Sequence, residues 1–257
     1  KDKLNEFIRQ TGSNVTAGFN CVISGLGDRV GLFKGLSEIG GGTSQQLADS
    51  LGLNERWVRE WLQHQACVNQ IEYEEETQRF SISPEAEAVL VDEDSPAYLM
   101  GAYHSALSVF PAAEKLEDAF RSGIGMTYDE HGSSCACGME KMGAYTKKHR
   151  LVQEILPLVP GLVERLSKGI KVADVGCGGA LSTVVMAQAF PSSTFVGYDT
   201  SEHALALARK NIEEMGVQNV VVANPSAQPL PSDSTLDFVT TFDVVHDTPY
   251  PDRMIQD

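Results

Sequence analysis

The sequence predicts an α/β chain in which a helical front part precedes a parallel β-sheet, and three observations carry this prediction. Short apolar segments alternate with helical ones between residues 169 and 257, as in a parallel sheet covered by helices on both faces. A Gly-Cys-Gly turn at 176–178 follows the first apolar segment. Two helical segments before residue 95 precede two strand-like ones. We therefore expect three parts, residues 1–95, 96–168 and 169–257.

The composition is that of a globular protein, with 42% hydrophobic and 21% charged residues in 257. The 35 acidic residues outweigh the 20 basic ones, and the formal net charge is −15. A surface of this charge repels phosphates, so neither nucleic acid nor an anionic membrane is an expected partner. No apolar run reaches the roughly 20 residues that a membrane-spanning helix needs.

The five cysteines are scattered and include no C-x-x-C pair, which predicts free thiols and neither a metal site nor a disulfide framework. The first ten residues, KDKLNEFIRQ, lack the apolar core of a signal peptide. These features are typical of a soluble protein in a reducing compartment. We expect a cytoplasmic location.

The first part has the plan of a winged helix. Thr43 and Gln46 fit a capping box, in which each residue satisfies a free amide of the other at the start of a helix. The expected order is helix, turn, helix and hairpin. The segments are two helices at 45–51 and 54–66, and two strands at 70–73 and 79–82 around an acidic turn, Glu74-Glu75-Glu76.

The charge of this part argues against DNA binding. Residues 30–95 hold four basic and thirteen acidic residues, and three glutamates form the tip of the expected wing. Phosphates would be repelled by such a surface. A protein–protein or dimerisation module is therefore the preferred interpretation.

The middle part is expected to be helical, with helices at about 98–121 and 145–156 and a Gly/Ser/Cys-rich break at 132–138. Most of its aromatic and histidine residues are expected in helix packing. Some of them would line a pocket if this part lies over the mouth of the sheet. The residues are Tyr103, His104, Phe110, Tyr128, His131, Tyr145 and His149.

The third part contains a pattern typical of cofactor sites. A strand at 171–175 contains Asp174 and leads into Gly176 and Gly178, and Asp199 follows the next strand, 21 residues after Gly178. Glycines let a ligand approach the backbone, and the following helix presents free amides. An acidic residue at the end of the second strand can accept hydrogen bonds from ribose hydroxyls. The pattern predicts a nucleoside-containing cofactor.

Two cofactors use such a turn. A dinucleotide prefers a third glycine where this chain has Leu181. S-adenosylmethionine lacks a phosphate and is associated with an acidic residue before the glycines, which Asp174 supplies. The pattern therefore favours S-adenosylmethionine over a dinucleotide.

The string VADVGCGGALSTVVMAQAFPSSTFVGYD resembles the first two motifs of class I S-adenosylmethionine-dependent methyltransferases. The string LFKGLSEIGGGTSQQLADSLGLNERWVREWL is similar to the N-terminal domain of O-methyltransferases that act on small molecules. A subgroup of these methyltransferases shares segments similar to GMTYDEHG and TFDVVHD of this sequence. The resemblance implies a Rossmann-like parallel-sheet methyltransferase domain preceded by an α-helical winged-helix domain.

The resemblance also implies residue roles. Asp174, Gly176 and Gly178 match the loop that holds the methionine part of the cofactor, and Asp243 matches a position near that end. Asp199 matches the acid that binds the ribose. Thr200 and the pair Ser226-Ala227 match residues beside the adenine. No metal ligand is implied.

His246 matches the histidine that deprotonates the substrate hydroxyl in plant O-methyltransferases. Asp247 follows it directly, and adjacent residues of a strand point to opposite faces. Asp247 is therefore not expected to orient His246. A carboxylate from a later part of the family's fold is the more natural partner.

Three departures from the family pattern bear on function. Ala180 replaces a glycine of the loop, and Ser226 replaces an aspartate, which weakens a hydrogen bond to the adenine. The family also has three further strands after the position where this sequence ends. The methyltransferase domain is therefore expected to be incomplete in this sequence.

Two hypotheses remain open. The first is an enzyme that transfers a methyl group from S-adenosylmethionine to a small-molecule acceptor, with a hydroxyl as candidate group, and that forms a homodimer through its N-terminal domain. The second is a non-catalytic remnant that binds the cofactor and acts in dimerisation or interaction. Ser226 and the missing strands favour the second hypothesis. The set Asp174, Gly176, Gly178 and Asp199, together with His246, favours the first.

Overall fold

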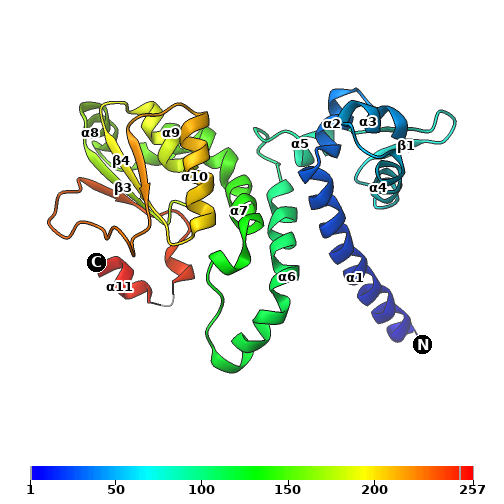
Figure 1. Cartoon of the computed structure of the whole chain (residues 1–257), viewed down its shortest axis with the longest axis horizontal. Helices are drawn as coiled ribbons and strands as arrows, with labels where there is room; N and C mark the ends of the chain where they lie inside the picture. Colours follow the sequence, from blue (N-terminus) through cyan, green and yellow to red (C-terminus); the bar gives the residue numbers. More distant parts are fainter. Residues whose placement is uncertain (1, 249, 257) are drawn as a thin grey trace. The chain divides into compact units, whose positions relative to one another are not determined.

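The computed structural model describes residues 2–248 and 250–256 and divides into two compact units, Lys1–Phe110 and Pro111–Asp257 (Figure 1). Each unit has its own hydrophobic core and is described by itself. Within the described ranges, we find no helix whose length and apolar character would let it traverse a bilayer.

The first unit has the winged-helix order that the sequence predicts. A long helix precedes the helix–turn–helix, and the two strands of the wing pair antiparallel, with Tyr73 opposite Phe80. The elements are α1 (Asp2–Arg29), α2 (Leu32–Glu38), α3 (Ser44–Leu51), α4 (Glu55–Cys67), β1 (Glu72–Glu74), β2 (Arg79–Ser81) and α5 (Pro84–Leu90).

The two helices predicted at 45–51 and 54–66 are present, and their ends lie within one residue of the predicted ones. The Thr43 hydroxyl accepts a hydrogen bond from the Gln46 amide, and the Gln46 side chain accepts one from the Thr43 amide. Gly52 ends α3 with a left-handed φ of 66°. Asn54 caps α4 through its side-chain oxygen.

The core of the first unit is formed by α2, α3, α4, β2 and α5, and the C-terminal part of α1 packs against it. The Trp61 ring packs edge-on against Phe33, with 4.7 Å between the ring centroids. Its indole N–H donates to the Ile23 carbonyl of α1 at 3.0 Å. A side chain at Gly27 would overlap the indole, because its Cβ would lie 2.3 Å from Trp61 Nε1. Glycine at this position therefore permits the close approach of α1 to α4.

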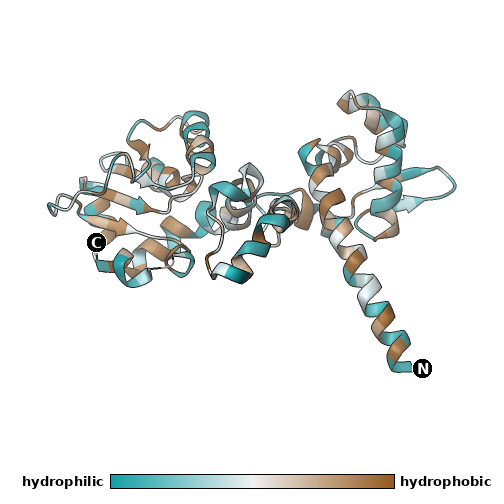
Figure 2. Cartoon of the chain, turned by 60° about the horizontal axis from the view of Figure 1, so that its bottom comes forward, coloured by the Kyte–Doolittle hydropathy of each residue, from teal (hydrophilic) through white to brown (hydrophobic). Residues whose placement is uncertain are grey.

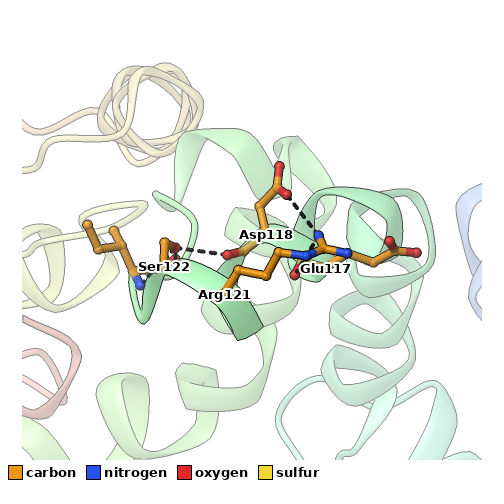
Figure 3. A network of polar contacts seen from close by, with 5 residues as sticks. Glu117, Asp118, Arg121 and Ser122 are labelled. Carbon is orange, nitrogen blue, oxygen red and sulfur yellow. Dashed lines mark hydrogen bonds and ion pairs between the residues drawn. The ribbon is translucent and has the colours of Figure 1, made fainter.

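A helical connector follows. Its elements are α6 (Met100–Ser122), η1 (Asp129–His131), α7 (Ser133–Tyr145), η2 (Thr146–Ile155), η3 (Leu156–Leu158) and α8 (Leu162–Lys168). Figure 3 shows how α6 ends. The Arg121 guanidinium donates to the Asp118 carboxylate at 3.2 Å, and the Ser122 hydroxyl donates to the Asp118 carbonyl at 2.9 Å.

Two predictions for the connector are wrong. The expected break at 132–138 is mostly helix, and the helix expected to begin at residue 145 instead begins at Ser133 as α7 and continues as the π-helical η2. Gly132, with a φ of 76°, turns the chain into α7. Gly138 and Ala144 are buried on this helix. Small residues that suggest a loop in the sequence thus allow close packing of a helix.

The second unit ends in four parallel strands in the order β5-β4-β3-β6, which confirms the predicted parallel sheet. The last strand is shorter than the expected 236–242. The elements are β3 (Lys171–Val175), α9 (Leu181–Ala189), β4 (Thr194–Tyr198), α10 (Glu202–Glu214), β5 (Val220–Ala223), β6 (Phe238–Thr240), η4 (Val245–Asp247) and α11 (Pro251–Gln256).

The two faces of this sheet differ. Val172 and Phe195 lie on the face that packs against α8, α9 and η2. Ala173 lies on the opposite face, where Leu230 and Leu236 cover part of the sheet.

Two residues of this opposite face remain open to solvent. Val221 and Val239 lie in one row across the sheet and are 58% and 50% exposed. The expectation of helices over both faces is therefore wrong for the described residues, whose helices cover one face.

Candidate functional site

The ends of β4, β3 and β6 lie side by side, because these strands are neighbours in one parallel sheet. The segments that follow them form one edge, where ligands of open parallel sheets bind. Asp199 follows β4, the glycine loop 176–179 follows β3, and Asp243 follows β6. The fold therefore brings together the strand-end residues that the sequence indicates.

The glycine loop requires its glycines for two different reasons. Gly176 has a φ of 73°, and a Cβ on it would lie 2.4 Å from Val244 Cγ2 in the segment after β6. Gly178 has a φ of 56°, and a Cβ on it would meet no atom within 4 Å. Gly176 thus allows a contact within the protein, whereas Gly178 borders open space in which a ligand could approach the backbone.

Asp199 is held by the backbone. One carboxylate oxygen accepts a hydrogen bond from the Gly178 amide, and the other accepts one from the Ser201 amide, both at 2.8 Å. The side chain is half-buried. Each carboxylate oxygen has a second lone pair, so Asp199 can still accept hydrogen bonds from a ligand.

Asp174 lies beneath the loop and is 1% exposed. Its two oxygens accept hydrogen bonds from the hydroxyl groups of Thr183 at 2.6 Å and Thr240 at 2.9 Å. Burial raises the pKa of this carboxyl above its ordinary value, and the two hydroxyl bonds oppose that shift. Asp174 thus connects β3 to α9 and β6.

The residues expected near an adenine lie at the ends of β4 and β5, on the side of Asp199 away from β3. Thr200 follows Asp199 directly, and Ser226 and Ala227 lie in the turn after β5. All three residues are exposed. The Asn224 side-chain amide donates to the Glu202 carboxylate at 2.9 Å and thereby connects this turn to the start of α10.

The segment after β6 forms the opposite side of the edge. Asp243 and His246 lie along a hollow of about 410 Å³, whose described lining also includes Thr241, Val244, Val245, Thr248 and Pro251. His246 Nδ1 is 3.7 Å from Asp243 Oδ1, and His246 Nε2 is 3.4 Å from Asp247 Oδ1.

The expectation that Asp247 points away from His246 is wrong. It assumes strand geometry, in which adjacent side chains alternate, but residues 245–247 form a 3₁₀ turn. His246 consequently has two carboxylates of its own segment as neighbours.

Sequence reasoning missed two residues of the connector that reach this edge. The Tyr128 hydroxyl donates to Asp247 Oδ2 at 2.5 Å. Asp129 Oδ1 accepts hydrogen bonds from the Ser201 hydroxyl at 2.7 Å and from the His203 amide at 3.2 Å. The signal in the sequence was the string GMTYDEHG, and Tyr128 belonged to the group of aromatic and histidine residues most of which were expected in helix packing.

A second missed cluster supports the glycine loop from α7. The Asn211 side-chain amide donates to Glu140 at 2.6 Å and to the Gly179 carbonyl at 2.7 Å, and Lys147 Nζ lies 3.6 Å from Glu140. Burial raises the pKa of the Glu140 carboxyl. Nothing in the spacing of these residues indicates that they meet.

Cys177 lies in the glycine loop and is buried. Burial raises the pKa of its thiol, and the nearby Asp174 and Asp199 carboxylates raise it further. The thiolate is the nucleophilic form, so these surroundings disfavour nucleophilic catalysis by Cys177. Among residues 2–248 and 250–256, no group of three His, Cys, Asp or Glu side chains could hold a metal ion.

Comparisons with known families agree with this architecture. Residues 18–92 match the Rv2258c-like winged HTH domain, and residues 166–257 match a methyltransferase domain. These matches assign a winged-helix domain to the first part of the chain and a methyltransferase domain to its last part. The resemblance seen in the sequence is thereby confirmed.

Particular relatives cover parts of the chain. The demethylmenaquinone methyltransferase of Anoxybacillus flavithermus is 38% identical over 77 residues, which are 29% of this chain and 32% of that protein. The chain spans about a third to a half of the length of the first curated relatives that it matches.

Solved structures show the same fold at low identity. The mitomycin 7-O-methyltransferase MmcR superposes with a TM-score of 0.65 at 17% identity, over 98% of this chain and 75% of that one. Human N-acetylserotonin methyltransferase, solved in complex with SAM, gives a TM-score of 0.61 at 13% identity, over 93% of this chain and 71% of that one.

Proposed function

We propose that this protein transfers a methyl group from S-adenosylmethionine to a hydroxyl of a small molecule. The observation that carries the proposal is the hydrogen bond between the Gly178 amide and the Asp199 carboxylate at the ends of β3 and β4. This hydrogen bond joins the glycine loop, which borders open space at Gly178, to Asp199. A carboxylate at the end of the second strand can accept hydrogen bonds from ribose hydroxyls. The loop and the acid therefore fit the cofactor.

In this proposal Asp199 binds the ribose, and Thr200, Ser226 and Ala227 lie beside the adenine. Gly176, Gly178 and Asp243 lie near the methionine part. Asp174 is buried and each of its oxygens accepts a hydrogen bond from a threonine hydroxyl, so its role is to position the loop through Thr183 and Thr240. The methyltransferase domain match and the fold support these assignments.

When bound, the cofactor supplies an electrophilic methyl group on its sulfonium sulfur. The chain has to align the acceptor and remove the proton of its hydroxyl. His246 is the candidate base, because it lies along the hollow after β6 and has an imidazole that can accept a proton. Neighbouring Asp243 and Asp247 stabilise the imidazolium that forms.

The charge around His246 supports one feature of the acceptor. The two carboxylates beside His246 and the net charge of −15 would repel an anion. Val244, Val245 and Pro251 add an apolar part to the hollow. We therefore expect a neutral or cationic acceptor with an apolar body.

The second candidate function is a cofactor-binding protein without catalysis. Ser226 favours it, because it replaces the family's aspartate in an exposed turn. The candidate base is also 63% exposed at its side chain, so His246 is poorly shielded from water.

Calorimetry with S-adenosylmethionine and S-adenosylhomocysteine tests both functions, together with a screen of methyl transfer to neutral phenols and alcohols. Binding with turnover supports the enzyme, and binding without turnover supports the second function. Absence of binding for both ligands would contradict both functions.

We propose a homodimer formed through the N-terminal unit. Along α1, apolar residues recur at intervals of four and seven, and each is more than half exposed. Figure 2 shows apolar and polar stretches alternating along this helix. The recurring residues are Leu4, Ile8, Val15, Phe19 and Leu26. Such spacing suits a helix–helix contact between two copies.

Light scattering tests the dimer. We expect a dimer for the wild type and a monomer for Ile8→Glu combined with Phe19→Glu. Phe120→Glu, at a 94% exposed residue of α6, serves as a control and should leave the dimer intact. A monomeric wild type would contradict the proposal.

The charge of the winged-helix part supports an interaction role without DNA. A gel-shift assay at low salt, where electrostatic attraction is strongest, should show no duplex binding. The five cysteines are free thiols, which is consistent with the cytoplasmic location that we predict.

A further inference from the structure

The connector segment between α6 and α7 reaches two sides of the candidate site with adjacent residues. Asp129 bonds to Ser201 and His203 at the start of α10, which follows β4. Tyr128 bonds to Asp247, which follows β6. The glycine loop follows β3, which lies between these two strands.

The geometry of the sheet makes this arrangement informative. Neighbouring strands are about 4.8 Å apart, so the ends of β4 and β6 are separated by about 10 Å. A tyrosine and the aspartate next to it can span this distance from one turn. We name the pair Tyr128–Asp129 the clasp, because it connects the two sides across the end of β3.

The clasp is itself well anchored. The amide and hydroxyl of Thr127 both donate to the Glu130 carboxylate, at 2.9 and 3.0 Å, which fixes the turn η1. The hydrogen bonds to Asp129 hold the pKa of its carboxyl below the ordinary value. Asp129 therefore remains a charged acceptor at the start of α10, where a negative charge is favourable.

The other side depends on the clasp. Residues 245–247 form a single 3₁₀ turn. The His246 ring lies 3.4 Å from Asp247 in this turn and 3.7 Å from Asp243, which precedes it. The Tyr128 hydroxyl gives Asp247 a much shorter contact, at 2.5 Å. Asp247 Oδ2 is thus held by Tyr128 while Oδ1 faces His246.

We propose that Tyr128 is a positioning residue, which holds Asp247 beside His246 while Asp129 fixes the clasp to α10. The role in catalysis rests on the proposed function. The mechanical role, in which Tyr128 restrains residues 243–248, does not. The two can therefore fail separately.

Hydrogen–deuterium exchange tests the mechanical role without activity. Tyr128→Phe removes the hydroxyl that bonds to Asp247, and Asp129→Ala removes the acceptor at α10. We expect both variants to speed exchange of the amides at 243–248 by about tenfold, as expected when local opening becomes easier. Tyr73→Phe, in the wing, and Asp118→Ala, on α6, are the matched controls and should leave this exchange unchanged.

Kinetics tests the positioning role. Tyr128→Phe should lower kcat by about 10-fold to 100-fold, because misplacing a catalytic group has effects of this size. The KM for S-adenosylmethionine should remain unchanged, since Asp199 and the glycine loop are untouched. Tyr128→Phe combined with Asp247→Asn should be no slower than the slower single variant, because both changes break one chain of contacts.

The outcomes separate the two claims. Unchanged exchange at 243–248 in Tyr128→Phe overturns the proposal whatever the activity. Faster exchange with an unchanged kcat, or additive losses in the double variant, overturns the positioning role. A wild type without turnover contradicts the proposed enzyme, and exchange then decides whether the clasp restrains the turn.

Discussion

The segment after β4 and the segment after β6 both present acidic side chains at one edge of the sheet, yet they are held differently. Asp199 accepts two hydrogen bonds from backbone amides, each at 2.8 Å. Asp243 Oδ1 lies 3.7 Å from the His246 ring, and the Asp243 side chain is 81% exposed. One side is fixed by the backbone, and the other by side chains.

This difference has a physical consequence. Backbone amides are placed by the fold itself, so Asp199 is ordered before any ligand arrives. Side chains such as those of His246 and Asp247 keep more rotamer freedom and need a further contact to lose it. We infer a preorganised cofactor side and an acceptor side that depends on Tyr128 from a distant part of the chain.

The largest expected effect comes from a substitution on the acceptor side, at His246. His246→Ala should lower turnover by roughly 10²-fold to 10⁴-fold, the usual contribution of a positioned acid–base group. Cofactor affinity should remain unchanged in calorimetry, since the Asp199 side is intact. If the variant keeps full turnover on a hydroxyl acceptor, alignment alone drives the transfer and His246 is not the base.

The next largest effect is expected where the glycine loop contacts the segment after β6. Gly176→Ala adds a Cβ at a φ of 73° that would overlap Val244. Left-handed strain and overpacking together should lower the free energy of unfolding by about 2–4 kcal/mol, measured by urea denaturation.

Gly161→Ala is the matched control for Gly176→Ala. Its φ is 74°, but its Cβ would meet no atom within 4 Å. It should cost about 1–2 kcal/mol from backbone strain alone. If the two variants lose the same free energy of unfolding, the overlap with Val244 contributes nothing to the loss in Gly176→Ala.

A smaller effect tests the cofactor side. Asp199→Ala should weaken S-adenosylmethionine binding by roughly 1.5–3 kcal/mol, the contribution of hydrogen bonds to a charged group. Calorimetry on a folded variant measures this loss, and Asp252→Ala, at an exposed residue of α11, is the control. Unchanged affinity for S-adenosylmethionine would contradict the proposal that Asp199 binds the ribose.

The smallest effect concerns Asp174, which lies beneath both sides. Burial raises the pKa of this carboxyl, so the native state retains a proton that the unfolded state has released above pH ~4. The stability contributed by this group therefore falls as pH rises from that value through the native-state pKa. The slope is at most about 1.4 kcal/mol per pH unit.

Asp174→Asn removes this titration. Urea denaturation between pH 4 and 8 should show a wild type that loses stability relative to the variant as pH rises. Asp252→Asn should follow the wild type. Parallel pH profiles for wild type and Asp174→Asn would contradict the raised pKa.

Local signals explain why much of the fold was predictable. The capping box at Thr43, the glycine at 52 and the strand 171–175 each depend on neighbours in sequence. The small residues at 132–138 misled the prediction, because a loop and a closely packed helix both favour such residues. Their surroundings in space separate these two cases, and spacing alone contains no such information.

By itself, the sequence determined that a winged helix precedes a parallel sheet, and it determined the strand-end set of Asp174, the glycine loop and Asp199. These features follow from periodicity and from residues whose positions are set by the strand on which they lie. Only the tertiary structure decided that Asp174 is buried under the loop, that Asp247 faces His246, and that Tyr128 and Asp129 reach both sides of the edge. Tyr128 and Asp247 are more than a hundred residues apart, and a contact over such a separation depends on how the whole chain folds.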